Sequence, residues 1–262
     1  MAVSKTFRFL ATPVAAVGLL AATMTTAAAQ QPRPNRGVAN IVLVHGAWAD
    51  GSSWSKVIPL LAKDYNVVAV QLPLSSLAAD VAAVKRALAL VDGPLLLVAH
   101  SYGGAVITEA GNDPKVVGLV YVAALAPQEG QSAFDLANAY PTPILQEVRP
   151  DQNAFLKITP TGIREDFAQD LSDAEQTILT VAQGPTAGGD ALSAPITSAA
   201  WRYKPTWFVI AAQDRVVSPA LQAIEDEQMK ATSIRLNASH VAMLSQPSVV
   251  ASFIRKAARD AK

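Results

Sequence analysis

Residues Leu95 to Ala105 read LLLVAHSYGGA, an apolar run that leads directly into a serine and then into a helical pattern. This order matches the strand–nucleophile–helix turn written G-x-S-x-G, with Ala99 in place of the first glycine. The serine of such a turn stands at a sharp corner, so its neighbours two positions away must be small enough for the strand and helix backbones to approach each other. Ala99 and Gly103 meet that requirement, and we predict that Ser101 is a catalytic nucleophile at the end of a buried strand.

Other segments repeat the buried-strand pattern. Apolar runs rich in β-branched residues lie at residues 41–44, 67–70, 116–122 and 207–210. Continuously apolar runs are typical of a parallel sheet that is covered on both faces. Helical patterns separate them, including the apolar face formed by Leu77, Val81, Val84 and Leu88. We therefore predict an α/β fold with a doubly wound, mostly parallel sheet of about six strands.

One long segment interrupts this alternation. Residues 127–203 show no clear strand pattern but several polar, helix-like pieces, of which Asp166–Ala182 is the best helix candidate. An excursion of this length exceeds an ordinary loop, and ligands of open α/β sheets bind at the strand ends. We expect residues 127–203 to form a mainly helical cap over a core made of residues 40–126 and 204–262. A loose insertion is the alternative, but the aliphatic residues in the segment favour packing.

A serine nucleophile needs a base, and the chain has three histidines. His100 directly precedes Ser101, so its side chain is expected to point away from the serine. His45 ends the first apolar run, where structuring the following loop is its expected role. His240 lies after the last predicted strand and before the final helix, which places it at the same sheet edge as Ser101. We therefore predict His240 as the base, with a surface-loop histidine as the alternative.

The base needs a carboxylate that orients it. Asp214 follows the apolar run 207–210 and is expected at the same sheet edge, whereas a turn or helix-cap role is its alternative. Glu129 is the competing acid. The order Ser101, Asp214, His240 is the order that accompanies this nucleophile turn, which favours Asp214.

An acyl-transfer site also needs donors for the developing oxyanion. The backbone N–H groups of Ala47, after the first strand, and of Tyr102, at the start of the helix, are the predicted pair. Trp48, Trp54 and His45 are candidates for the substrate pocket, although packing is the default role for an aromatic residue here. We predict no metal and no organic cofactor.

Four motifs together resemble the α/β-hydrolase superfamily: His45-Gly46-Ala47-Trp48, Ala99 to Gly104, Asp214-Arg215, and His240 to Leu244. They are most similar to the branch that holds plant methylesterases, hydroxynitrile lyases and bacterial esterases, from about Asn40 to the C-terminus. The resemblance implies an α/β-hydrolase fold. Hydroxynitrile lyases of the branch carry a threonine and a lysine where this chain has Gly46 and Val241, so esterase chemistry is favoured. A serine nucleophile disfavours dehalogenase and epoxide hydrolase chemistry.

These inferences predict a serine hydrolase that cleaves a small or medium uncharged ester or lactone through an acyl-enzyme. A low-turnover binding or sensor protein on the same scaffold is one alternative, and a hydroxynitrile lyase-type enzyme is another. The predicted partner is a small-molecule ester. The sequence assigns no oligomeric state.

The N-terminus has the pattern of a secretory signal peptide. Lys5 and Arg8 precede an apolar run from Phe9 to Ala22, and small residues end at Ala29. We predict that residues 1–29 are cleaved after Ala29, that residues 30–39 form a linker, and that the protein is secreted or periplasmic. An uncleaved anchor is the alternative, but the run is shorter than the roughly 20 residues of a spanning helix, so no stable membrane anchor is expected after cleavage.

Composition narrows the function classes. The chain has 21 basic and 21 acidic residues, a balance that argues against nucleic-acid binding and against a polybasic membrane anchor. It has no cysteine, which excludes disulfides, thiol catalysis and thiolate metal sites. The sequon at Asn237 adjoins the predicted catalytic loop, where a glycan would crowd the site, and this favours a bacterial source.

Overall fold

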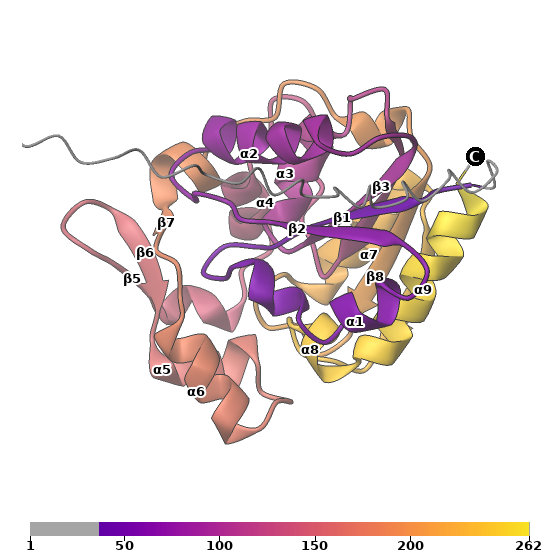
Figure 1. Ribbon diagram of the computed structural model, residues 1–262. Coiled ribbons are helices and arrows are strands. Elements are labelled where there is room, and N and C mark those ends of the chain that lie inside the picture. Colours follow the sequence, from indigo (N-terminus) through magenta and orange to yellow (C-terminus); the bar gives the residue numbers. More distant parts are fainter. Residues whose placement is uncertain (1–36, 262) are drawn as a thin grey trace, which may run out of the picture. The chain divides into compact units, whose positions relative to one another are not determined.

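Six parallel strands form the central sheet of the computed structural model, which describes residues 37–261. The predicted signal peptide and most of the predicted linker lie outside the described residues. Along the sheet the strand order is β2-β1-β3-β4-β8-β9 (Figure 1). The strands are β1 (Asn40–Val44), β2 (Asn66–Val70), β3 (Leu95–His100), β4 (Val116–Val122), β8 (Thr206–Ala211) and β9 (Thr232–Leu236). The predicted mostly parallel sheet of about six strands is confirmed.

Both faces of this sheet are buried, which explains the continuous apolar runs. In β1, Val42 and Val44 belong to one core cluster, whereas Ile41 and Leu43 belong to the other. The other central strands alternate in the same way because successive side chains of a strand point to opposite faces. All residues of β1, β3 and β8 are buried.

Helices cover the two faces. Packed on one face are α2 (Leu77–Ala89), α3 (Gly103–Ala110) and α7 (Pro219–Met229), and on the other α1 (Ile58–Leu61), α8 (Ala242–Ser245) and α9 (Pro247–Asp260). Figure 1 shows α2 and α3 above the sheet and α1, α8 and α9 below it. The Ser76 side chain caps α2, and Pro219 and Pro247 open their helices at a position where a missing N–H costs no hydrogen bond. The doubly wound prediction is therefore confirmed.

The chain order places a crevice at one edge of the sheet. From β1 the chain moves outward to β2 and then returns to β3 on the other side of β1. At such a switch point the loops after neighbouring strands diverge and leave room for a ligand. The loop after β1 begins at His45, and the loop after β3 begins at Ser101, so these two residues flank the crevice.

The corner at Ser101 requires small neighbours. Ser101 has φ +54°, a left-handed conformation that a non-glycine residue rarely adopts. A Cβ atom at Gly103 would lie 2.5 Å from the carbonyl oxygen of His45, and one at Gly104 would lie 2.3 Å from that of Leu125. These backbone approaches allow β3, α3 and the loops after β1 and β4 to meet at one point.

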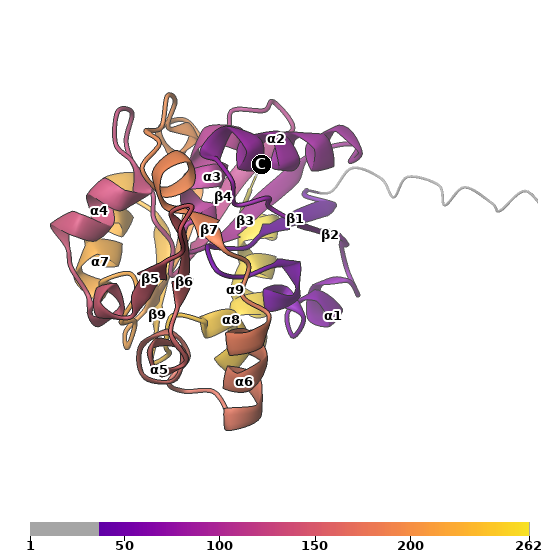
Figure 2. The same cartoon turned by 90° about the vertical axis from the view of Figure 1, so that its left-hand side faces the viewer.

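The segment 127–203 departs in part from its prediction. It contains a three-stranded antiparallel sheet of β5 (Val148–Pro150), β6 (Phe155–Ile158) and β7 (Thr186–Ala187), where no strand was expected (Figure 2). Strands of two to four residues are too short to show an alternating pattern in the sequence. The segment's longer helices are α4 (Ala133–Ala139) and α6 (Asp173–Val181).

The expected helix Asp166–Ala182 is shorter than predicted. A capping box of Ser172 and Glu175 starts α6 at Asp173, and the residues before it form a π-helical turn, η3 (Ile163–Phe167). The remaining pieces are short: α5 (Pro160–Gly162) and the single turns η1 (Gly51–Trp54), η2 (Pro143–Gln146), η4 (Gly188–Leu192) and η5 (Ala200–Arg202). Within residues 37–261, no helix has the length and apolar character needed to cross a membrane.

A buried carboxyl group lies between α7 and the loop after β4. One oxygen of Glu225 accepts the N–H of Ala126 at 2.6 Å, and the other oxygen has no partner among the described residues. Burial raises the pKa of Glu225 to about 8, because an ionised carboxylate loses its hydration there. The folded protein therefore holds a proton on Glu225 at neutral pH.

This proton makes stability depend on pH. In the unfolded chain a glutamate ionises above about pH 4.3, so the unfolded state loses a proton that the folded state keeps up to about pH 8. The free energy of unfolding should therefore fall as pH rises between these values. The variant Glu225→Gln cannot ionise at this position. We expect its free energy of unfolding to rise relative to that of wild type by roughly 1.4 kcal/mol per pH unit over that range. Urea unfolding at several pH values measures it.

The control is Glu227→Gln, which removes an exposed carboxyl group from the same helix. The free energy of unfolding of this variant should depend on pH in the same way as that of wild type. Parallel pH profiles for wild type and Glu225→Gln would show that Glu225 is not protonated in the folded state.

Candidate active site

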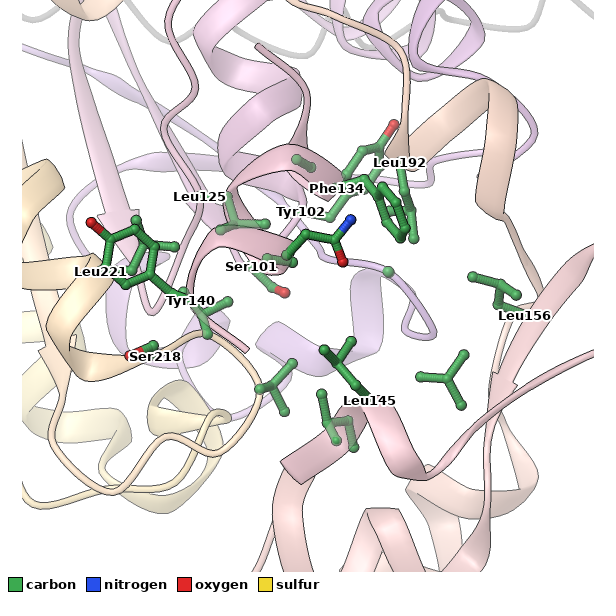
Figure 3. Close-up of a pocket in the computed structure, with 18 of the residues that line it drawn as sticks. Ser101, Tyr102, Leu125, Phe134, Tyr140, Leu145, Leu156, Leu192, Ser218 and Leu221 are labelled. Atoms are coloured by element: carbon green, nitrogen blue, oxygen red, sulfur yellow. The ribbon is translucent and has the colours of Figure 1, made fainter. Parts of the chain in front are cut away.

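Ser101 lies at the corner between β3 and α3, and its hydroxyl points into a cavity (Figure 3). The carbonyl oxygen of Ser101 accepts the N–H of Gly104 at 2.9 Å and that of Leu125 at 3.2 Å. These bonds tie the corner to the first turn of α3 and to the loop after β4. Ser101 is 5 % exposed, so a reactant reaches it only through the cavity.

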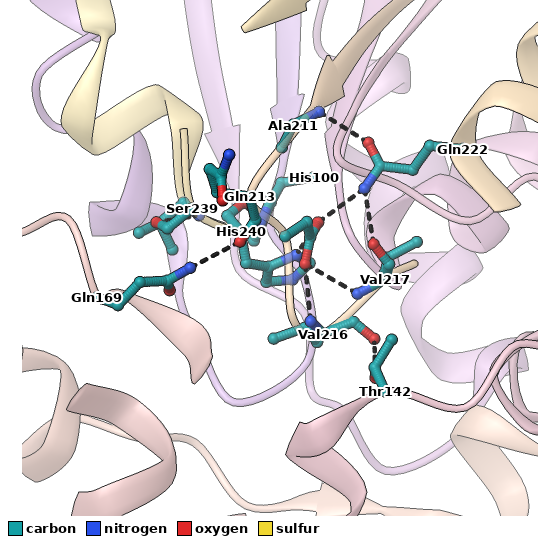
Figure 4. Close-up of polar contacts among 12 residues, drawn as sticks. His100, Thr142, Gln169, Ala211, Gln213, Val216, Val217, Gln222, Ser239 and His240 are labelled. Atoms are coloured by element: carbon teal, nitrogen blue, oxygen red, sulfur yellow. Dashed lines mark hydrogen bonds and ion pairs between the residues drawn. The ribbon is translucent and has the colours of Figure 1, made fainter. Parts of the chain in front are cut away.

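The structure brings His240 and Asp214 into direct contact. Nδ1 of His240 lies 2.8 Å from Oδ2 of Asp214, and both side chains are fully buried (Figure 4). Because a carboxylate oxygen accepts, Nδ1 is the protonated nitrogen, and the lone pair of a neutral ring is on Nε2. The ring is therefore in the tautomer that a general base requires.

Asp214 is fixed by further hydrogen bonds. Its Oδ1 accepts the N–H groups of Val216 at 2.8 Å and Val217 at 2.9 Å, and its Oδ2 accepts the Gln222 amide at 2.8 Å. Gln222 also donates to the carbonyl of Val217, and its own oxygen accepts the N–H of Ala211 (Figure 4). Gln222 was not predicted, because a glutamine within a helix carries no local signal of such a role.

Nε2 of His240 is buried and has no hydrogen-bond partner among the described residues. The structure shows no hydrogen bond between this nitrogen and Ser101. Hydrogen bonds of a catalytic site are often long or absent before substrate binds, so this arrangement does not exclude proton transfer. The pairing of base and acid is thus observed, and the role of Ser101 stays a prediction.

His100 packs against His240 instead of pointing into solvent or the cavity. The two ring centroids are 4.4 Å apart, and Nε2 of His100 donates to the carbonyl oxygen of His240 at 2.9 Å. Burial, followed by the charge of His240, lowers the pKa of His100 well below its ordinary value. His100 is therefore a neutral residue that holds the backbone of His240.

His45 is part of the loop framework. Its Nε2 accepts the N–H of Leu72 at 2.9 Å, and its Nδ1 lies 2.8 Å from the carbonyl oxygen of Gly46. Burial lowers the pKa of His45, so it too is neutral. It is not among the residues that line the cavity, in contrast to its prediction as a pocket residue. Both of its nitrogens are bonded to backbone groups, one in the loop after β1 and one in the loop after β2. The expected loop-structuring role agrees with these contacts.

The predicted oxyanion donors both line the cavity that contains Ser101. Within residues 37–261, neither the N–H of Ala47 nor that of Tyr102 donates to a protein acceptor. The next N–H, that of Trp48, is taken by the Thr186 hydroxyl at 3.0 Å. Two free donors at a buried serine form the pattern of an oxyanion hole.

The competing acid lies elsewhere. Glu129 bonds the N–H of Ala199 at 2.9 Å and pairs with Arg202 at 2.8 Å on the surface. These two contacts account for both of its oxygens, and His240 is paired with Asp214 instead. Trp54 is fully buried in the core, as its default packing role predicted.

The cavity has a volume of about 410 Å³ and an apolar lining. None of its lining residues carries a charge. Figure 3 shows aliphatic side chains around Ser101 from both the core and the segment 127–203. The core contributes Trp48, Leu125, Val216, Val217 and Leu221, among others, and the segment contributes Phe134, Tyr140, Ile144, Leu145, Leu156 and Leu192, among others.

One turn of the segment 127–203 and the residues just after it contact the loops of both His240 and Asp214. The Phe167 ring packs edge-on against His240, with centroids 5.1 Å apart. Asp170 accepts the N–H of Ser239 at 2.8 Å, and the buried Asp166 pairs with Arg215 at 2.6 Å. These contacts were not predicted, because they join residues far apart in the sequence.

The described part of the chain, residues 37–261, contains no group of three or more histidine, aspartate or glutamate side chains that could hold a metal ion.

Comparison with known proteins agrees with this geometry. Residues 41–253 match the alpha/beta hydrolase family. An alpha/beta hydrolase of Aspergillus novofumigatus is 26% identical over 84% of this chain and 97% of its own length, and a carbendazim-hydrolysing esterase of Nocardioides is 34% identical over 38% of this chain and 47% of its own. The crystal structure of a pyrethroid hydrolase from Sphingobium faniae has the same fold, with a TM-score of 0.73, 24% identity and coverage of 85% and 98% of the two chains. The family match of this chain, over residues 41–253, covers the core and the candidate site. This chain therefore belongs to the alpha/beta hydrolase family.

Proposed function

We propose that this protein is a serine esterase that hydrolyses medium-sized, uncharged carboxylic esters, with Ser101 as nucleophile. The observation that carries the proposal is the cavity in which Ser101 lies beside two unpartnered N–H groups, those of Ala47 and Tyr102. An acyl-transfer enzyme needs this combination of a nucleophile and oxyanion donors, whereas a core serine does not.

In the proposed reaction, Ser101 Oγ attacks the ester carbonyl carbon and His240 Nε2 takes its proton. The carbonyl oxygen becomes an oxyanion that accepts hydrogen bonds from Ala47 and Tyr102. His240 then gives the proton to the departing alcohol, which leaves an acyl group on Ser101. Water then attacks this acyl group and passes a proton to His240, which returns it to Ser101 Oγ as the Oγ–acyl bond breaks and the acid is released. Asp214 holds the imidazole through both steps.

The lining of the cavity supports the substrate class. A charged acid or alcohol group would lose its hydration in a cavity without a charged side chain, so an uncharged ester is favoured. The volume leaves space for apolar groups larger than acetate or methyl. One relative is named for an esterase activity, that on carbendazim, and this name is consistent with ester hydrolysis here.

A cyanohydrin lyase is the weaker candidate. The lyases that this chain resembles carry a lysine where it has Val241, which is apolar and 1 % exposed. No cation at that position is available to stabilise cyanide as it leaves. A binding protein without turnover is the other candidate, and it is separated from an esterase by the reactivity of Ser101.

We further propose that the protein acts outside the cytoplasm, in the periplasm or as a secreted enzyme. This rests on the signal-like residues 1–29 alone, which lie outside the described part of the chain.

The reactivity of Ser101 is tested by a fluorophosphonate probe, which labels activated serines covalently. Wild type should be labelled at one site, and Ser101→Ala should lose the label and ester hydrolysis. Ser218→Ala is the matched control because Ser218 lines the same cavity but caps α7, and it should be labelled like wild type. Absence of label on wild type, or equal labelling of Ser101→Ala, would remove the basis for an esterase.

The substrate class is tested with p-nitrophenyl acetate, butyrate, hexanoate and octanoate. Each buried methylene contributes about 0.8 kcal/mol, so kcat/KM should rise roughly fourfold per methylene until the cavity is filled. A matched ester that carries a carboxylate at the end of its acyl chain should react much more slowly. A preference for acetate or for the charged ester would contradict the apolar substrate class.

A further inference from the structure

The loop that carries one proposed oxyanion donor ends in a strained residue. Trp48 follows Ala47 and has φ +58°, the left-handed region that a bulky side chain rarely adopts. Such a conformation persists only where the surroundings hold it. Ala47 lines the cavity, and the peptide between Ala47 and Trp48 adjoins the peptide that carries the Ala47 N–H. The orientation of the first peptide therefore limits the direction of the Ala47 N–H.

Two residues of the small antiparallel sheet hold Trp48. The Thr186 hydroxyl of β7 accepts the backbone N–H of Trp48 at 3.0 Å, and the carbonyl oxygen of Leu156 in β6 accepts its indole N–H, also at 3.0 Å. Leu156 and Thr186 are partners in the ladder between β6 and β7, which Figure 2 shows side by side. The small sheet therefore accepts hydrogen bonds from both the backbone and the side chain of Trp48.

The other end of the loop is fixed by the core. His45 is bonded to the N–H of Leu72, and a Cβ atom at Gly46 would lie 2.6 Å from the Cβ of Ser101. Ala47 is thus the one residue between an end held by the core and an end held by Thr186. Among the described residues its N–H has no protein acceptor, whereas the neighbouring N–H, that of Trp48, is bonded to Thr186.

Strand β7 is also connected to Tyr102, the residue of the second proposed oxyanion donor. The N–H of Ala187 donates to the carbonyl oxygen of Leu74 at 2.9 Å, and the N–H of Leu74 donates to the buried Asp80 at 2.8 Å. The other oxygen of Asp80 accepts the Tyr102 hydroxyl at 2.8 Å. β7 is therefore linked to the residues of both proposed donors.

From these contacts we infer that Thr186 is a positioning residue for the oxyanion hole: its hydroxyl holds the Trp48 peptide so that the Ala47 N–H points at the developing oxyanion. The inference rests on the proposed function, because the oxyanion hole is itself part of that proposal. Thr186 does not touch the substrate. It is fully buried and absent from the cavity lining, so its effect passes through the loop.

The test compares Thr186→Val, which keeps the shape and loses the acceptor, with Thr186→Ser, which keeps the acceptor. Rates of ester hydrolysis are divided by the number of sites that a fluorophosphonate labels, so that misfolded protein does not count. Affinity is also measured for a trifluoromethyl ketone, to which Ser101 adds to give a tetrahedral oxyanion. Thr177→Val is the control, because that hydroxyl bonds only a carbonyl within α6.

For Thr186→Val we expect kcat per labelled site to fall about tenfold or more and the ketone to bind more weakly by a similar factor. KM should stay within about twofold, since ground-state binding is unchanged. Thr186→Ser and Thr177→Val should both behave like wild type. If Thr186→Val does not fold, Thr186→Ala, which also lacks the acceptor, carries the same expectation.

Three results would overturn the inference: wild-type kcat and ketone affinity in Thr186→Val, equal losses in Thr186→Val and Thr186→Ser, or a loss confined to KM. These outcomes leave the proposed esterase intact, because wild type still hydrolyses ester. If wild type neither reacts with the probe nor hydrolyses any ester, the proposed function fails and the role of Thr186 fails with it.

Discussion

The backbone corner at Ser101 is the constraint on which the site depends. Its left-handed φ of +54° turns the chain abruptly from β3 into α3, and it exists only because Gly103 and Gly104 allow backbone oxygens of the neighbouring loops to approach. The same turn directs the serine hydroxyl into the cavity and leaves the Tyr102 N–H without a protein acceptor among the described residues. One strained residue thus places both the proposed nucleophile and a proposed oxyanion donor at the switch point of the sheet.

The segment 127–203 stabilises the parts of the site that this corner does not hold. Its sheet contacts the oxyanion loop through Thr186 and Leu156, and its π-helical turn contacts the base and acid loops through Asp166 and Phe167. The segment also supplies much of the apolar cavity wall. Under the proposed function, changes in this segment are expected to alter catalysis as well as substrate choice, because the elements that line the cavity also hold the loops of Asp214 and His240.

The core and the contact between His240 and Asp214 could be predicted because their signals are local. Continuous apolar runs gave the strands, and Ser101, Asp214 and His240 each follow a strand whose end meets the same edge of the sheet. The antiparallel sheet could not be predicted, since strands of two to four residues show no period. Thr186 and Gln222 were missed for a different reason: each acts through a partner that only the folded chain brings near.

Mass spectrometry of the intact protein measures the covalent role of Ser101 most directly. Enzyme quenched in acid during turnover of a p-nitrophenyl ester should carry the mass of one acyl group, and peptide mapping should locate that group on Ser101. Ser101→Ala should carry none. An acyl group on another residue, or ester turnover by Ser101→Ala at the wild-type rate, would contradict a mechanism built on this serine.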